Sequence, residues 1–372
     1  MKILVTGASG FIGKNLIAQL KNKGYSDILA CDVDTEPALL DSYVRECAFV
    51  FHLAGVNRPN NPDEFMTGNR DLTANLLECL QKYRNKAPVL ISSSIQAKRD
   101  NPYGRSKKAA EDLIFAYGKE SGVDVFVYRL PNVFGKWCRP NYNSAVATFC
   151  FNIARNLPVQ VNDSNPEMSL AYIDDVIEEF ICVLKGSPNR QGDFCFVEPV
   201  HQVTLGRIVE LLGSFRESRE NLRVLDTSDL FVKKLYSTYL SYLSEDNFSY
   251  PLTSHIDARG SFTEIIRTPE RGQFSVVVSK PGVTRGNHWH HTKTEKFLTL
   301  HGDGVIRLRR IDSNKIIEYL VSSERPEVVD VPPGYTHSIV NMGSCDLIAF
   351  IWANECFDPE HPDTYPLEVN PL

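Results

Sequence analysis

Val5-Thr6-Gly7-Ala8-Ser9-Gly10-Phe11-Ile12-Gly13 is the stretch that decides the fold of the first half of the chain. It follows a short apolar run and opens a segment whose apolar residues have helical spacing. Gly7 permits a tight turn, Gly10 permits close approach of the backbone to a pyrophosphate, and Gly13 permits close packing of the helix on the sheet. The free N–H groups at the start of the helix would then face the pyrophosphate. Because Asp32 ends the next strand-like run, where a carboxylate can bind a ribose hydroxyl, the stretch predicts a dinucleotide-binding unit.

Strand-like and helix-like runs alternate from residue 1 to about 200. Apolar residues recur at helical spacing in 14–21 and 72–83. Five short apolar runs are typical of buried strands: Ile3-Leu4-Val5, Ile28-Leu29-Ala30-Cys31, Phe49-Val50-Phe51, Val89-Leu90-Ile91 and Val125-Phe126-Val127-Tyr128. Because strands that alternate with helices pair in parallel, this half predicts an α/β Rossmann-type fold with a doubly wound parallel sheet.

The pattern changes after about residue 250. Gly- and Pro-bearing turns separate short strand-like runs at 274–278, 297–300, 305–308, 328–331 and 347–351. These runs predict an all-β sandwich or small barrel. The stretch 236–250, rich in Tyr, Ser and Leu, is the expected connection, so we predict one domain at 1–243 and a second at 252–372.

Composition restricts the classes of function. The 372 residues carry a net charge of −6 and no basic stripe, so we expect no nucleic-acid partner. The nine cysteines, from Cys31 to Cys356, include no C-x-x-C pair, which is typical of reduced thiols rather than of a disulfide framework. We find neither a signal peptide nor an apolar run of the roughly 18 residues that a membrane span needs. The expected location is therefore the cytoplasm, without a membrane partner.

A second set of residues indicates proton transfer. Tyr103 and Lys107 are four residues apart, so on a helix they share one face. A cation beside a phenol lowers the pKa of the phenol, which would let Tyr103 exchange a proton with a carbonyl or alcohol oxygen near neutral pH. Ser92-Ser93-Ser94 end the fourth strand-like run, at the edge of a parallel sheet where ligands bind. A Tyr-x-x-x-Lys spacing alone is common on helix surfaces, but with the glycine loop and these serines it predicts a catalytic site.

Residues 1 to about 240 resemble the extended short-chain dehydrogenase/reductases that act on nucleotide sugars. The matching segments are 6–13, His52-Leu53-Ala54-Gly55, Asn69, Ser92-Ser93-Ser94, Tyr103 with Lys107, 129–135 and 172–176. The resemblance implies that Tyr103 is the acid/base, Lys107 its partner and Ser94 the hydroxyl that holds the substrate oxygen. It also implies cofactor contacts, with Asn132 near the nicotinamide, at Gly7, Ser9, Gly10, Phe11, Ile12, Gly13, Asp32, Leu53, Ala54, Asn69, Tyr103, Lys107 and Asn132.

Two departures from that family pattern concern the substrate. Only eight residues separate Ser94 from Tyr103, which implies a shortened loop over the substrate. Met168 stands where many relatives carry an Arg that grips the diphosphate. Substitutes for this Arg are expected among Arg139, Lys136 and Asn143.

The histidines of the second half are clustered, with four of them between positions 288 and 301. On an extended strand His288 and His290 project from the same face. Glu295 can return on the neighbouring strand, and His337 follows in a later segment. Three imidazoles and a carboxylate suit a divalent transition metal such as zinc. The alternative is a set of surface histidines on a metal-free barrel.

These segments resemble the two sequence motifs of the cupins, which implies a jelly-roll fold for the second domain. The segment 282–295 matches the first motif in spacing, whereas the second has Pro326 where a glycine is usual. The segments 257–264 and 285–288 also resemble the 4-keto-6-deoxy-hexose epimerases of L-rhamnose synthesis. In those enzymes the residue aligned with His288 is the base, so His288 is either a metal ligand or a base.

Over the whole chain the resemblance is to the bifunctional reductase–cupin enzymes of capsular and O-antigen polysaccharide synthesis. It implies that the cupin inverts carbon 3 of a UDP-2-acetamido-2,6-dideoxy-4-keto-hexose. The reductase would then reduce the carbon 4 ketone, which gives UDP-2-acetamido-2,6-dideoxy-L-talose. It also implies NADPH as cofactor and a homodimer, since cupins commonly pair through their barrels. However, Asp32 would repel a 2′-phosphate and no Arg stands between positions 32 and 44, so NADH is the alternative.

Two rival interpretations remain at this point. In the first, an NAD-dependent nucleotide-sugar epimerase or dehydratase uses the cupin only to dimerise. A dehydratase needs an acid between Ser94 and Tyr103, where Asp100 is the one candidate and is expected in a turn. In the second, the chain is a non-enzymatic nucleotide sensor, against which the intact Ser94, Tyr103 and Lys107 count.

Overall fold

The computed structural model describes residues 1–161 and 166–370, which form two units. The N-terminal unit comprises Met1–Ser214 and Thr227–Glu245, and the C-terminal unit comprises Phe215–Asp226 and Asp246–Leu372. The segment Phe215–Asp226 was expected in the first domain but groups with the second. The reason is a pair of backbone hydrogen bonds, from Val224 N–H to the Arg267 carbonyl at 3.0 Å and from Arg267 N–H to the Leu222 carbonyl at 2.9 Å.

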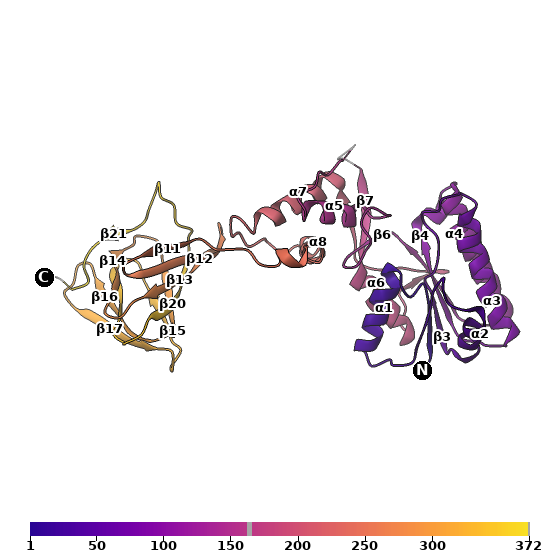
Figure 1. Cartoon of the computed structure of the whole chain (residues 1–372), viewed down its shortest axis with the longest axis horizontal. Coiled ribbons are helices and arrows are strands. Elements are labelled where there is room, and N and C mark those ends of the chain that lie inside the picture. Colours follow the sequence, from indigo (N-terminus) through magenta and orange to yellow (C-terminus); the bar gives the residue numbers. More distant parts are fainter. Residues whose placement is uncertain (162–165, 371–372) are drawn as a thin grey trace. The chain divides into compact units, whose positions relative to one another are not determined.

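A seven-stranded sheet forms the centre of the N-terminal unit, in the order β2-β1-β3-β4-β5-β9-β8 (Figure 1). Neighbours pair in parallel from β2 to β9, and β8 pairs antiparallel with β9. The strands are β1 (Ile3–Thr6), β2 (Ile28–Cys31), β3 (Phe49–His52), β4 (Val89–Ser94), β5 (Val125–Leu130), β8 (Arg190–Gln191) and β9 (Phe194–Cys195). The chain order reverses at β1, which lies between β2 and β3, and ligands bind beside such a switch point.

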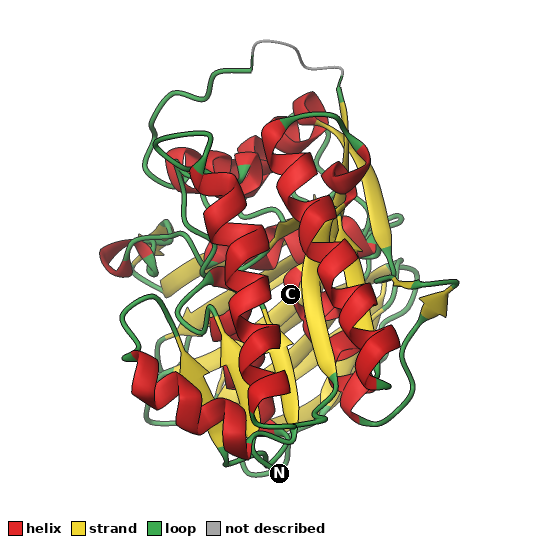
Figure 2. Ribbon diagram, turned by 90° about the vertical axis from the view of Figure 1, so that its right-hand side faces the viewer, coloured by secondary structure: helices red, strands yellow, loops and turns green. Residues whose placement is uncertain are grey.

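Helices cover both faces of this sheet (Figure 1), and Figure 2 shows helices in front of the strands on one of them. Because successive strand residues point to opposite faces, Ile3 and Val5 pack with α1 and α6, whereas Leu4 packs with α2, α3 and α4. The helices are α1 (Phe11–Asn22), α2 (Pro37–Glu46), α3 (Leu72–Lys82), α4 (Pro102–Ser121) and α6 (Ile173–Leu184). The predicted doubly wound fold is confirmed. None of the helices in the described ranges is both long enough and apolar enough to cross a membrane.

A smaller sheet, in the order β10-β7-β6, completes the N-terminal unit. Its strands are β6 (Asn132–Phe134), β7 (Glu167–Tyr172) and β10 (Val200–Thr204). The remaining helical segments of the chain are α5 (Ala145–Ile153), α7 (Leu205–Glu217), α8 (Leu230–Leu240) and the short η1 (Met66–Asp71), η2 (Ile95–Lys98) and η3 (Glu245–Asn247), of which α7 and η3 cross the boundary between the two units. The prediction that 236–250 is a connection was wrong for its first residues, which belong to α8. Asp229 caps this helix by accepting the Phe231 N–H at 2.7 Å, and Leu235 and Tyr239 are buried one turn apart.

Two antiparallel sheets form the C-terminal unit, in the orders β11-β12-β13-β20-β15-β18 and β17-β16-β19-β14-β21. Their strands are β11 (Ser254–Asp257), β12 (Gly260–Thr268), β13 (Gly272–Ser279), β14 (Thr284–Trp289), β15 (Glu295–His301), β16 (Asp303–Arg310), β17 (Ile316–Ser322), β18 (Val328–Val331), β19 (Tyr335–Asn341), β20 (Leu347–Ala353) and β21 (Tyr365–Pro366). Inward side chains of both sheets, including Phe297, Ile306 and Leu347, form one core. The predicted all-β jelly roll is confirmed.

Candidate functional site

The glycine loop joins β1 to α1 at the switch point of the parallel sheet. Gly7 has a φ of +68°, and a Cβ there would lie 2.7 Å from the Ala54 nitrogen. A Cβ at Gly13 would lie 2.2 Å from the Gly7 carbonyl oxygen. Both positions therefore require glycine, and α1 begins close against β1 with its first N–H groups at the loop.

Asp32 follows β2 and reaches the same loop. Its carboxylate accepts the Ser9 N–H at 2.7 Å and the Val33 N–H at 2.9 Å. Burial opposes ionisation, but these two N–H groups hold the pKa of the Asp32 carboxyl below its usual value. A carboxylate that is ionised at neutral pH thus lies beside the glycine loop.

A cavity of about 730 Å³ opens at the carboxyl ends of β1, β4 and β5. The predicted residues that line it are Gly7, Ser9, Gly10, Phe11, Ile12, Gly13, Leu53, Ser94, Tyr103, Lys107 and Asn132. Four cations also line it (Lys14, Arg99, Lys107 and Arg139), and no Asp or Glu does so among the described residues. The cavity is therefore suited to anionic ligands.

Three predicted cofactor contacts, Asp32, Ala54 and Asn69, do not line this cavity. Asn69 is buried, and its polar atoms are already paired. Its side-chain oxygen accepts the Val56 N–H at 3.0 Å, and its amide donates to the Val56 carbonyl at 2.8 Å and to the Ser106 hydroxyl at 3.0 Å. Asn69 therefore braces the segment after β3.

Ser94, Tyr103 and Lys107 meet in the cavity because β4 and α4 carry them to its wall. Asn101 caps α4 by accepting the Gly104 N–H at 2.7 Å, which fixes the first turn that holds Tyr103. The Ser94 hydroxyl accepts the Gln96 N–H at 3.1 Å and lies close enough to the Tyr103 phenol to lower its pKa. Lys107, one turn further along α4, donates from Nζ to the Ser92 carbonyl at 3.1 Å.

The expectation that Lys107 lowers the pKa of Tyr103 was wrong for the described side chains. Burial raises the pKa of Tyr103, and the neighbouring Ser94 offsets that rise only in part. The ammonium of Lys107 is directed at the Ser92 carbonyl instead. Burial also lowers the pKa of Lys107 to about 8, against the opposing charge of Glu111.

Sequence reasoning missed Glu111, which holds α4 on the sheet. Its carboxylate is fully buried and accepts hydrogen bonds from the Ser93 hydroxyl at 2.6 Å and from Arg129 Nε and Nη2 at 2.9 and 2.6 Å. Arg129 belongs to the matched segment 129–135 and stacks on Phe194, with its Cζ 3.8 Å from the ring centroid. Glu111 stands at the same four-residue interval as Tyr103 and Lys107, and that spacing could have identified it.

The residues at the substrate end of the cavity differ in part from those predicted to bind the diphosphate. Met168 lines it from β7, and of the three suggested substitutes Arg139 and Asn143 line it too. Lys136 instead forms an ion pair with Asp174. Arg99 and Trp137, which sequence reasoning missed, also line the cavity. Trp137 has a φ of +69°, a conformation that is rare for a bulky residue and that no spacing in the sequence reveals.

We expect Lys107→Met to stabilise the cofactor-free protein by at least ~1 kcal/mol at pH 7. The pKa of Lys107 is lowered in the folded state, so its protonation opposes folding below about pH 8. Between that value and the unfolded pKa the unfolded chain binds more protons, so the wild type gains stability with rising pH relative to the variant. Unfolding midpoints at pH 7 and 9.5 measure this difference. An equal stabilisation by Lys107→Met at both pH values would contradict the charge assigned to Lys107.

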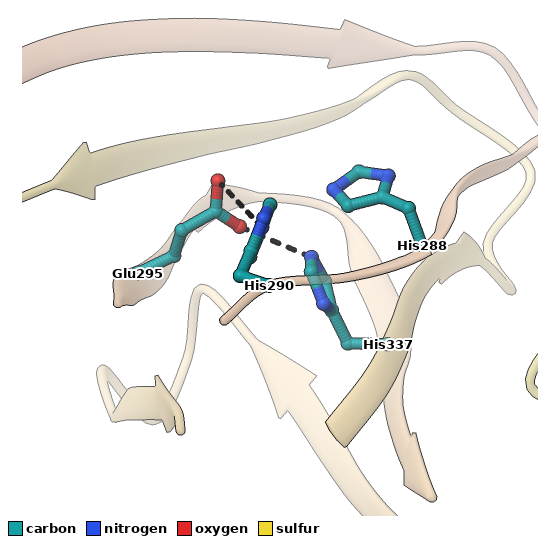
Figure 3. Close-up of side chains that lie close together, drawn as sticks. All are labelled: His288, His290, Glu295 and His337. Carbon is teal, nitrogen blue, oxygen red and sulfur yellow. Dashed lines mark ion pairs between the residues drawn. The ribbon is translucent and has the colours of Figure 1, made fainter. Parts of the chain in front are cut away.

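The C-terminal unit brings together His288, His290, Glu295 and His337 (Figure 3). One ligand atom of each lies within 4.8 Å of the others. Strand pairing explains this cluster, since β14 and β19 place His288 opposite His337 and β15 begins at Glu295. His337 Nε2 lies 3.0 Å from one carboxylate oxygen of Glu295, and His290 Nε2 lies 3.6 Å from the other.

The polar atoms of this cluster fit a metal ion. His290, His337 and Glu295 are buried, and Nε2 of His290 and both ring nitrogens of His337 lack a hydrogen-bond partner among the described residues. Burial opposes ionisation of Glu295, but His290 and His337 beside it hold its pKa well below the usual range. Burial and the neighbouring His337 lower the pKa of His288 to about 4. Three imidazoles with a carboxylate form a ligand set that suits zinc, and such an ion would explain the buried ring nitrogens that lack a hydrogen-bond partner.

Known proteins resemble this chain over its whole length. The model of the NAD dependent epimerase/dehydratase family matches residues 3–194, and that of the polysaccharide biosynthesis C-terminal domain matches residues 255–365. A UDP-2-acetamido-2,6-beta-L-arabino-hexul-4-ose reductase of Pseudomonas aeruginosa is 46% identical over 369 residues, 99% of each chain.

A solved structure has the same two-unit architecture. The capsular polysaccharide assembling protein CapF of Staphylococcus aureus is 50% identical, with a TM-score of 0.94 over 99% of this chain and all of that one. The predicted resemblance to the reductase–cupin enzymes of capsular polysaccharide synthesis is confirmed. This chain belongs to the NAD dependent epimerase/dehydratase family and carries, behind its Rossmann-type domain, a polysaccharide biosynthesis C-terminal domain.

Proposed function

We propose that the chain catalyses two consecutive steps on a UDP-2-acetamido-2,6-dideoxy-4-keto-hexose. The C-terminal unit inverts carbon 3, and the N-terminal unit reduces the carbon 4 ketone to give UDP-2-acetamido-2,6-dideoxy-L-talose for capsular or O-antigen polysaccharide. The observation that carries this proposal is the presence of two sites in one chain, a Ser94–Tyr103–Lys107 group in a cation-lined cavity and a buried three-histidine, one-carboxylate cluster. The name of the Pseudomonas aeruginosa relative, a UDP-hexul-4-ose reductase, supports the substrate class.

Inversion at carbon 3 requires removal and return of the proton beside the ketone. A metal held by His290, Glu295, His337 and His288 would supply positive charge next to the ketone oxygen, which makes that proton acidic. We assign His288 as a ligand, and the base role of the aligned residue in the rhamnose-pathway epimerases is its alternative. The two roles are separable, because a ligand's removal lowers the metal content whereas a base's removal leaves it intact.

Reduction of the ketone requires a proton at oxygen when hydride reaches carbon. The nicotinamide, when bound, would supply the hydride. Ser94 would hydrogen-bond the carbon 4 oxygen, and Tyr103, which lines the same cavity, would donate the proton to it. Lys107 would orient the cofactor and replace the proton on Tyr103. The hydrogen bonds between Glu111, Ser93 and Arg129 would keep this constellation in place.

The substrate diphosphate needs cations that replace the Arg missing at position 168. Arg99 and Arg139 line the cavity, and the Arg139 guanidinium carbon lies 5.2 Å from the ring centroid of Tyr142. We propose that these two guanidiniums bind the diphosphate. Trp137, which lines the same cavity and is 54% exposed, offers a flat apolar face on which uracil would stack.

We propose NADH as the preferred cofactor, although the family resemblance implies NADPH. The ionised carboxylate of Asp32 lies 2.7 Å from the Ser9 nitrogen, where it would accept hydrogen bonds from a ribose and repel a 2′-phosphate. No Arg or Lys stands between positions 32 and 44 to bind such a phosphate.

We expect Asp32→Ser to raise kcat/KM for NADPH by about tenfold while kcat/KM for NADH falls, because the substitution removes both the repulsion and the ribose partner. Asp34→Asn removes a charge from the same loop, two residues away and exposed, and serves as the matched control. Steady-state rates with each nucleotide measure the ratio. A wild-type preference for NADPH that Asp32→Ser leaves unchanged would contradict the assignment.

The rival interpretation, an NAD-dependent epimerase or dehydratase, predicts a different outcome with the same substrate. Asp100, the candidate acid of a dehydratase, does not line the cavity and lies 2.6 Å from Arg105 on the surface. Product analysis by NMR with stoichiometric NADH tests the proposal. A product inverted at carbon 3 and reduced at carbon 4 would support it, and a product with the original configuration at carbon 3, or no net use of NADH, would overturn it.

Two further properties remain predictions. All nine cysteines are free, and this supports the expected cytoplasmic location. A homodimer, paired through the β-barrels as cupins commonly are, is the expected assembly.

A further inference from the structure

Asp363, just before β21, is hydrogen-bonded to the turn that joins β14 to β15. One oxygen of its carboxylate accepts the His291 N–H at 2.9 Å, and the other accepts the N–H groups of Thr292 at 2.8 Å and Lys293 at 2.9 Å. The second oxygen also lies 3.2 Å from the Thr292 hydroxyl. A single side chain therefore holds three consecutive backbone N–H groups of the turn.

The backbone of Asp363 directly contacts one of the four residues of the proposed metal site. Its carbonyl oxygen hydrogen-bonds Nδ1 of His290. Because a carbonyl can only accept, Nδ1 must carry the proton and the lone pair must be on Nε2. That nitrogen is buried, has no hydrogen-bond partner among the described residues and lies 3.6 Å from the Glu295 carboxylate. The contact thus selects the tautomer that a metal ligand needs and fixes the plane of the ring.

The turn held by Asp363 also carries a cation to the cluster. Lys293 is nearly buried, and its Nζ lies 3.6 Å from the same carboxylate oxygen of Glu295 that faces His290. Its position depends on the backbone at 291–293, which the Asp363 carboxylate holds. The Asp363 carbonyl therefore contacts His290, and the Asp363 carboxylate holds the turn that carries Lys293. His290 and Lys293 both face the same carboxylate oxygen of Glu295.

We infer that Asp363 is a positioning residue of the metal centre, whose carboxylate anchors the turn 291–293 and so keeps its own carbonyl on His290. The inference rests on the metal centre proposed above. The backbone carbonyl survives any substitution, but without the carboxylate the pairing of Tyr365 and Pro366 with β14 is left to hold it opposite Nδ1, and the turn 291–293 loses its anchor. The contact that holds Nε2 of His290 toward Glu295 and His337 is then weakened, so metal affinity falls while the barrel core, which Asp363 does not enter, stays packed.

The experiment uses the full chain without an affinity tag, as Asp363→Asn, Asp363→Ala and the control Asp358→Asn. Asp358 lies in the same C-terminal segment. Its carboxylate contacts the Glu360 N–H and the exposed His361, neither of which belongs to the four-residue cluster. Zinc affinity is measured by competition with a chromophoric chelator, and cobalt(II) absorption reports the ligand geometry. The unfolding temperature of the metal-free protein reports folding.

We expect zinc affinity to fall about 10-fold in Asp363→Asn and about 100-fold in Asp363→Ala, with an altered cobalt spectrum and a metal-free unfolding temperature within about 2 °C of the wild type. Asp358→Asn should match the wild type. Unchanged affinity in Asp363→Ala would overturn the inference, as would a loss of affinity matched by unfolding of both metal-free variants. A wild type that binds neither zinc nor cobalt would instead overturn the metal centre itself.

Discussion

Tyr103→Phe is expected to slow reduction of the ketone by about 10³-fold, because it removes the only proposed proton donor to the carbon 4 oxygen. The substitution keeps the ring, which contacts Phe65 at a centroid distance of 5.5 Å, so the wall of the cavity is preserved. Ser94 retains its hydroxyl and can still bind the substrate oxygen. The loss should therefore fall on kcat, with KM for the sugar changed by less than about threefold. Oxidation of NADH followed by absorbance measures both constants.

Tyr117→Phe is the matched control for this variant. Tyr117 lies on the same helix and is buried, and its hydroxyl is 3.4 Å from the Asn85 carbonyl, outside the cavity lining. It should reduce the ketone at the wild-type rate. A Tyr103→Phe rate within about threefold of that control would contradict the role of Tyr103.

Glu295→Gln is expected to abolish metal binding in the C-terminal unit and to slow proton exchange at carbon 3 by at least about 100-fold. Glu295 is the only anion of the cluster, and its carboxylate faces the Nε2 atoms of both His290 and His337. Glutamine has the same shape, but its amide donates toward nitrogens that need their lone pairs for a metal. Elemental analysis of tag-free protein and the exchange rate measure the two effects.

The control for the loss of charge is Glu318→Gln, which removes a carboxylate paired with Arg307 on the surface of the same unit. Its metal content should equal that of the wild type. Glu295→Gln with full metal content would show that the carboxylate is not a ligand. If the variant lacks metal but exchanges the carbon 3 proton at the wild-type rate, the metal takes no part in that exchange.

Sequence patterns predicted the features of the fold and the site that depend on local geometry. The glycine loop, the alternation of strands and helices and the four-residue interval from Tyr103 to Lys107 each follow from the periodicity of one element. His288 and His290 share a face for the same reason. His337 was assigned from its residue type and matched by the resemblance to the cupins, but no local periodicity places it, since its position opposite His288 depends on the pairing of strands that are distant in the sequence.

The features that sequence patterns missed depend on tertiary contacts. Asp363 reaches His290 over 73 residues through a backbone carbonyl, which has no signature in the residue type. The pKa of Tyr103 depends on burial and on the neighbouring Ser94, and spacing along a helix reports neither. Tyr236 and its neighbours were assigned to a linker because their composition is polar and aromatic, yet α8 buries its apolar side against the N-terminal unit.

The most direct test of the two-step account is deuterium exchange on the UDP-linked 4-keto sugar in D2O without any nicotinamide, followed by NMR. It compares the wild type with His290→Ala and with Tyr103→Phe. We expect deuterium at carbon 3 with the wild type and with Tyr103→Phe, and none with His290→Ala, because exchange depends on the C-terminal cluster alone. Absence of exchange with the wild type, or equal exchange with His290→Ala, would contradict the assignment of epimerisation to that cluster.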